Sequence, residues 1–125
     1  MALELTEKAV QYLRHLEKLE FSGMRAMCTD TATVWHNDGK GEQTIDENLQ
    51  QLEQNSAGGG GFALRYDIVR QFQKSDEVLQ QHVLHITMPG QPGTELPVAM
   101  YFGFKDGLID RIEEYANMTP PSEAA

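Results

Sequence analysis

The sequence predicts an α+β domain, with helices in its first half and an antiparallel meander of strands in its second half. Apolar residues recur at three- and four-residue spacing over the first twenty residues and again after residue 44, as they do in amphipathic helices. From residue 62 onward apolar and polar residues alternate, and short turn-like segments separate the alternating stretches. Because a parallel crossover needs about a dozen residues, such short connections favour antiparallel neighbours.

Length and charge narrow the class of protein. The 125 residues suit one domain, which we expect over residues 1–118, followed by a loose tail over 119–125. Nineteen acidic against ten basic residues give a net charge of −9, which argues against nucleic acid and anionic membranes as partners. The single cysteine, Cys28, cannot form an intrachain disulfide, and neither a signal peptide nor a membrane-spanning run is visible. We therefore expect a cytoplasmic protein.

Two helices are expected before the first strand. Thr6 is the expected N-cap of the first helix, which should end near Phe21 and bury one apolar stripe (Ala9, Tyr12, Leu13, Leu16 and Leu19). A shorter helix should begin at Ser22 and place Met24, Met27 and Cys28 inward.

A strand and a third helix should follow. The β-branched and aromatic residues 31–36 run into Asn37-Asp38-Gly39, a turn signal. Thr44 and Glu47 match a capping box, and Ile45, Leu49 and Leu52 give the apolar stripe of a helix that should end before the glycines 58–61, which are expected to form a flexible connector.

Four further strands are expected over residues 62–72, 78–88, 96–104 and 108–115. Alternation places three sets of residues each on one face of its strand: Leu64, Tyr66, Ile68, Arg70 and Phe72; Val98, Met100, Phe102 and Phe104; Leu108, Asp110, Ile112 and Glu114. A sheet with one apolar face must cover it, and the three helices are the available cover. If the sheet is strongly curved, the two layers can enclose a pocket.

The order of these elements, with the segments 30–36 (DTATVWH) and 107–115 (GLIDRIEEY), resembles the nuclear-transport-factor-2-like superfamily over nearly the whole chain. The SnoaL-like and ketosteroid-isomerase-like branch is the most similar. The resemblance implies a cone-shaped, curved antiparallel sheet covered by the three helices, a deep pocket for a small apolar molecule, and a homodimer formed through the open side of the sheet. Members of the superfamily include isomerases, polyketide cyclases, epoxide hydrolases, dehydratases and domains without any chemistry, so the fold alone does not fix an activity.

The resemblance also implies roles for three positions. Ketosteroid isomerases use a tyrosine of the first helix in the oxyanion hole and an aspartate of the first strand to move the proton. Counted from the shared segment 32–34, Tyr12 falls at the tyrosine position and His36 at the position of the base. Met100 corresponds to the second oxyanion-hole acid and cannot donate a hydrogen bond. Steroid isomerisation by that set of groups is therefore not expected.

His36 is the first candidate for catalysis, as a general base that titrates near neutral pH, with Tyr12 as hydrogen-bond donor. Asp38 could orient His36, although closing a turn with Gly39 is the simpler role for it. The other candidates for the pocket wall are Trp35, Tyr66, Met100 and Glu113. Trp35 should point away from His36 in a regular strand, and of Glu113 and Glu114 at most one can face inward. The sequence contains no His-x-x-x-His or Cys-x-x-Cys spacing, so we expect no metal site. We expect no cofactor either.

Two functions are therefore open. In the first, the protein is an isomerase, cyclase or hydrolase that acts on an apolar, oxygen-bearing small molecule through His36 and Tyr12. In the second, it is a non-catalytic ligand-binding or dimerisation module of the same fold, as the loss of a donor at Met100 suggests. An open apolar pocket with both side chains pointing inward favours the first, and a filled one favours the second.

Overall fold

The computed structural model describes residues 3–57, 63–90 and 92–116. The expected connector at 58–61 and the expected tail at 119–125 lie outside these ranges. Within the described ranges, three helices and six strands follow one another: α1 (Leu5–Glu17), α2 (Phe21–Ala26), β1 (Cys28–His36), β2 (Glu42–Thr44), α3 (Ile45–Ala57), β3 (Ala63–Lys74), β4 (Glu77–Thr87), β5 (Thr94–Lys105) and β6 (Leu108–Ala116).

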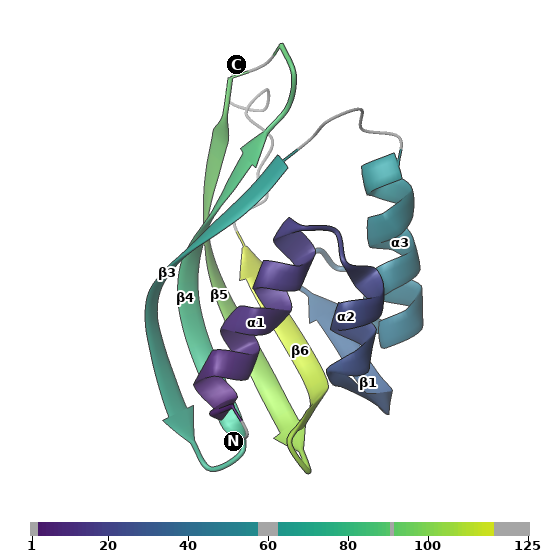
Figure 1. The fold of residues 1–125 in the computed structure, drawn as a ribbon, viewed down its shortest axis with the longest axis vertical. Coiled ribbons are helices and arrows are strands. Elements are labelled where there is room, and N and C mark those ends of the chain that lie inside the picture. The colour runs from purple at the N-terminus through teal and green to yellow at the C-terminus, as the bar shows by residue number, and fades with distance from the viewer. Residues whose placement is uncertain (1–2, 58–62, 91, 117–125) are drawn as a thin grey trace.

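The strands form one sheet in the order β2-β1-β6-β5-β4-β3, with all three helices on its inner face (Figure 1). The predicted α+β class is confirmed, and the sheet curves around the helices as a cone that does not close. The expectation of a wholly antiparallel sheet is wrong, because β1 and β6 pair in parallel. These two strands are not joined by a short turn, since α3 and four strands lie between them, so turn lengths could not reveal their direction.

The predicted apolar stripes form the core. Leu13, Leu16, Leu49 and the inward residues of β5 are all less than 9% exposed. Leu19 is an exception at 39%, because α1 ends at Glu17 and Leu19 adopts a positive φ of 57°. Cys28 is buried as expected, but on the first residue of β1 and not on the second helix.

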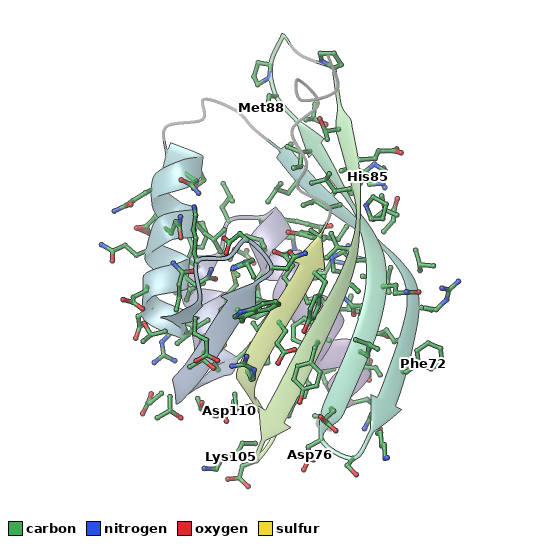
Figure 2. All side chains as sticks on the ribbon, turned by 180° about the vertical axis from the view of Figure 1, so that it is seen from behind. Phe72, Asp76, His85, Met88, Lys105 and Asp110 are labelled. Carbon is green, nitrogen blue, oxygen red and sulfur yellow. The ribbon has the colours of Figure 1, made fainter. Side chains whose placement is uncertain are left out.

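A β-bulge reverses the alternation in the second half of β3. The pairing with β4 shifts between Ile68 and Arg70, so that Val69 is an extra residue. Beyond it Gln71 faces inward and donates hydrogen bonds to Thr6 O (2.9 Å) and Gln80 Oε1 (2.8 Å). Phe72 projects from the outer face at 65% exposure (Figure 2), which corrects the prediction that Arg70 and Phe72 share the inner face with Tyr66.

A second bulge corrects the predicted face of the start of β6. The pairing with β5 shifts between Gly103 and Phe104, and Ile109 is fully buried, whereas Leu108 is 39% exposed. Leu108 therefore does not share the inner face, whereas Ile112 and Glu114, further along the strand, do line the interior.

The capping box predicted at the start of α3 is present. The backbone amide of Glu47 donates to Thr44 Oγ1 (3.1 Å), and the backbone amide of Thr44 donates to Glu47 Oε1 (2.8 Å). Thr44→Ala is expected to lower the free energy of unfolding by about 1 kcal/mol, because an orphan amide loses its acceptor. Urea denaturation checks this, with Thr44→Ser as the control that retains the hydroxyl. Equal losses in both variants would contradict a capping role.

Candidate functional site

A pocket of about 320 Å³, here called the inner pocket, lies between the helices and the inner face of the sheet. Its volume is at the low end of the range of about 300–1,000 Å³ typical of small-molecule sites. The wall is mostly apolar, with a few polar groups: Tyr12, Leu16, Leu19, Phe21, Met24, Val34, His36, Asn48, Leu52, Asn55, Leu64, Tyr66, Leu84, Ile86, Met100, Ile112 and Glu114.

His36 and Glu114 form an ion pair on the wall of this pocket. The parallel register of β1 and β6 makes them direct neighbours, and His36 Nε2 lies 3.2 Å from Glu114 Oε1. Both side chains are partly shielded from water, at 31% and 21% exposure. The Glu114 carboxylate raises the pKa of His36 through its hydrogen bond and its charge, against the opposing effect of burial, and Asp38 adds a further increase. His36 is therefore a carboxylate-held imidazole.

Two tyrosines supply hydroxyl groups to the same pocket. Tyr12 projects from α1 and packs edge-on against Phe102, with ring centroids 6.2 Å apart. Burial raises the pKa of both Tyr12 and Tyr66, so each phenol stays protonated. Among the residues that the structure describes, neither hydroxyl has a hydrogen-bond partner, and both side chains line the pocket. A ligand oxygen could accept from either.

The first helix fixes the position of Tyr66. Tyr66 lies on β3, an edge strand, where its backbone groups lack a neighbouring strand on one side. Arg14 donates to the Tyr66 carbonyl (2.8 Å), and the Tyr66 amide donates to Glu17 Oε2 (2.7 Å). Arg14 and Glu17 also pair with each other at 2.8 Å. Two side chains of α1 thus supply hydrogen-bond partners for the free backbone groups of Tyr66 on the edge strand. They also fix Tyr66 relative to Tyr12, which lies on the same helix.

A buried histidine packs behind Tyr66. The His82 ring is 5.2 Å from the Tyr66 ring at an interplanar angle of 82°, and its Nδ1 is 3.0 Å from Gln80 Nε2. Burial lowers the pKa of His82, so it is neutral at physiological pH. Since Gln80 donates to Nδ1, the proton sits on Nε2, which has no partner among the described residues. His82 supports the pocket wall without lining it.

The structure brings four of the predicted residues to the pocket and separates the others from it. Tyr12, His36, Tyr66 and Met100 line the inner pocket. Trp35 and Glu113 do not, because strand alternation turns them to the outer face. There the Trp35 ring packs against the Tyr115 ring with centroids 5.2 Å apart, and Glu113 accepts hydrogen bonds from Arg111 (2.7 Å) and Tyr115 (2.8 Å).

Asp38 occupies the turn after β1. Its Oδ1 accepts from the Lys40 amide at 2.9 Å, as in an Asx turn, and its side chain is not part of the inner wall. Glu114, not Asp38, is the acid that holds His36. The sequence pattern does indicate Glu114, because it is two residues from Ile112 on the same strand and therefore faces the same side as this apolar residue, which must face the core.

Other features of the molecule do not make a comparable site. An open hollow of about 870 Å³ near the ends of β3, β4 and β5 is larger, but its wall is more polar than apolar and contains neither His36 nor a tyrosine. Within the described ranges, no group of three or more His, Cys, Asp or Glu side chains is placed to hold a metal ion. No helix in the described part of the chain is long and apolar enough to cross a membrane.

Known structures share this architecture. A SnoaL-like protein from Shewanella putrefaciens CN-32, described as a candidate polyketide cyclase, superposes with a TM-score of 0.80 at 12% identity, over 98% of this chain and 96% of its own. An LEH-like epoxide hydrolase from M. tuberculosis gives 0.75 at 18% identity, over 90% and 82%. A protein with the ketosteroid-isomerase-like fold from Catenulispora acidiphila, solved with trimethylamine, gives 0.75 at 12%, over 94% and 88%.

These similarities establish the nuclear-transport-factor-2-like fold predicted from the sequence. At such low identity they establish the fold alone, and they transfer no activity to this chain. No family model matches the sequence, and no curated protein matches it.

Proposed function

We propose that this protein is an enzyme of proton transfer, an isomerase, cyclase or hydrolase, acting on a small apolar molecule that carries an oxygen. The observation that carries the proposal is the His36–Glu114 pair on the wall of an apolar pocket that two tyrosines also line, whose hydroxyls have no partner among the described residues. A carboxylate-held imidazole and nearby donors are the groups that general acid–base chemistry on a carbonyl or an epoxide requires.

The tautomer of His36 determines which of its nitrogen atoms can act in each proton-transfer step. When neutral His36 donates from Nε2 to Glu114, its lone pair is on Nδ1, which can accept a proton from the ligand. The resulting imidazolium is stabilised by the Glu114 carboxylate at 3.2 Å. The Tyr12 and Tyr66 hydroxyls donate to the oxygen on which negative charge develops, and the proton can then return from His36 to a different atom of the ligand.

A non-catalytic ligand-binding module is the second candidate. It is favoured by Met100, which lines the pocket at 6% exposure and offers only a thioether where a second donor would help an oxyanion. The two candidates share the pocket and the ligand class and differ in whether His36 moves a proton.

Solvent deuterium exchange separates them. Apolar cyclic ketones are incubated with the protein in D₂O, and loss of the α-proton signals is followed by NMR. We expect acceleration by the wild type and by His85→Gln, which changes a histidine outside the inner pocket, and an acceleration lower by about 10²–10⁴-fold in His36→Gln. Probe binding that shifts the pocket resonances without any exchange would favour the binding module. Failure of every probe to bind would contradict both candidates.

We also expect a homodimer formed through the outer face of the sheet. The strand registers align Phe72, Leu79 and Tyr101 in one row across β3, β4 and β5, and Phe72 and Leu79 are 65% and 47% exposed. Contiguous exposed apolar surface of this kind usually marks an interface. Light scattering at micromolar concentration should give twice the chain mass, and Leu79→Lys should give a monomer. A monomeric wild type would contradict this expectation.

A further inference from the structure

A second hollow, here called the outer chamber, adjoins the inner pocket through a shared wall. It measures about 290 Å³ and lies between α3 and the turn that connects β1 to β2. His36, Glu114, Asn48 and Asn55 line both spaces, so the proposed catalytic pair stands at their junction. The inner pocket is mostly apolar, whereas most of the residues that line the outer chamber carry a polar group, and polar and apolar atoms share its surface about equally.

Three carboxamide side chains that line the outer chamber form a hydrogen-bond chain in which every bond has the same direction. Asn48 Nδ2 donates to Gln43 Oε1 at 3.1 Å, and Gln43 Nε2 donates to Gln51 Oε1 at 2.8 Å. Because every donation runs the same way, the Asn48 carbonyl oxygen at one end and the Gln51 amino group at the other have no partner in the described part of the chain. A chain of this kind polarises its free ends, which strengthens the acceptor at Asn48 and the donor at Gln51.

We infer that the outer chamber binds the neutral, hydroxyl-bearing end of an amphiphilic ligand whose apolar part occupies the inner pocket. This inference rests on the proposed function, for which it specifies the class of substrate: an apolar body with a polar end that carries at least one hydroxyl group. The polar end would pass His36 and Glu114, which places the atoms next to it at the proton-transfer pair.

The chemistry of the chamber favours a neutral head group over an ion. Carboxamides both donate and accept, as hydroxyl groups do, so the free ends at Asn48 and Gln51 match a diol or a sugar-like group. The chamber is lined by charged groups of both signs: the carboxylates of Asp38 and Glu114, the ammonium group of Lys40 and the protonatable imidazole of His36. Neither a cationic nor an anionic head group therefore finds a set of partners of one sign.

A purely structural role is the competing interpretation of the amide chain. It joins Gln43 on β2 to Asn48 and Gln51 on α3, and it could serve only to hold that helix against the edge of the sheet. A structural role predicts that loss of the chain affects stability without changing which head group is preferred.

The test compares ligands that share an eight-carbon chain and differ in the head group: octane-1,2-diol, octanoate and octylamine. Binding is measured by protein-detected NMR titration in mildly alkaline buffer, in which octanoate is an anion and octylamine a cation. The variants are Gln43→Met and Gln51→Met, which keep side-chain length and remove the amide. Gln50→Met is the matched control, because Gln50 is exposed on the same helix and lines neither space.

We expect the wild type and the control to bind the diol more tightly than either ion. Each chain variant should weaken diol binding roughly fivefold to tenfold, the effect of about one hydrogen bond, and leave octanoate binding unchanged. Equal affinity for all three heads, or a diol preference that both chain variants retain, would overturn the inference and leave the proposed function standing. If no ligand shifts the resonances of Leu84 or Ile112, the inner pocket does not bind ligands and the proposed function fails as well.

Discussion

Replacing Phe102 by alanine is expected to lower the free energy of unfolding by about 3–5 kcal/mol, one of the largest effects of any single substitution in this protein. Phe102 is fully buried on β5, where its ring packs edge-on against Tyr12 and stacks with Phe104 at a centroid distance of 6.4 Å. Truncation removes apolar burial and leaves a cavity that the rigid sheet cannot close.

Phe72→Ala is the matched control, because Phe72 is the same residue type on the edge strand β3 of the same sheet but is 65% exposed. Both substitutions are made in the Leu79→Lys background, so that loss of a dimer does not contribute, and both are measured by urea denaturation. Phe72→Ala should change the free energy of unfolding by no more than about 0.5 kcal/mol. Similar losses in the two variants would mean that the core is not centred on β5.

The sequence carried enough information for the class of fold and for most of its elements. Helical spacing located α1 and α3, and the Thr44–Glu47 capping box marked the start of α3 within one residue. Asp106 and Gly107, both at positive φ, form the tight turn that was expected between β5 and β6. These features depend on residues close together in the chain, which is why pattern alone could reveal them.

Features set by distant contacts could not be predicted in this way. The parallel pairing of β1 with β6 joins residues about eighty positions apart, and no turn between them records its direction. The three residues of β2 are too few for an alternation pattern, and they become a strand only by pairing with β1. The bulge at Val69 carries no glycine or proline to announce it, and its single extra residue moves Phe72 to the outer face.

The same distinction applies to the candidate site. The residues His36 and Tyr12 could be selected from the sequence because they lie at positions that a resemblance assigns to a pocket, and both line it. Sequence proximity points to Asp38 as an acid that could orient His36, whereas Glu114, which pairs with His36, is near it only through the β1–β6 register. Glu114, and not the predicted Glu113, lines the pocket, because Glu114 is two residues from the inward-facing Ile112 on the same strand.

His36 is expected to titrate above its ordinary pKa of about 6.5 in the wild type and below it in Glu114→Gln. In the wild type the hydrogen bond and charge of Glu114 outweigh burial, and Asp38 adds to them. Without Glu114, burial becomes the largest remaining influence and disfavours the imidazolium. NMR titration of the histidine ring signals measures both values. A His36 pKa that stays unchanged in Glu114→Gln would contradict the pairing.

The raised pKa of His36 also has a defined effect on stability. The folded state binds the proton more tightly than the unfolded state, so the pair stabilises the fold below about pH 6.5, and this contribution is lost as the pH rises through the folded pKa. His82 acts in the opposite sense, because its pKa is lowered and its contribution is lost as the pH falls. Comparing wild type with His36→Gln across this range isolates the first effect, since His82 is common to both proteins.

Among substitutions at the candidate site, replacing His36 should have the largest effect on the rate of proton transfer. His36→Gln is expected to reduce enzyme-catalysed deuterium exchange by about 10²–10⁴-fold, the usual contribution of a general base. For a base the rate falls as the pH drops below the pKa of His36, so Glu114→Gln, by lowering that pKa, should move the acidic limb of the pH–rate profile to lower pH. A residue with only a structural role would reduce the rate without moving the limb. A profile that stays in place in Glu114→Gln would therefore show that Glu114 does not act through His36, even if the rate falls.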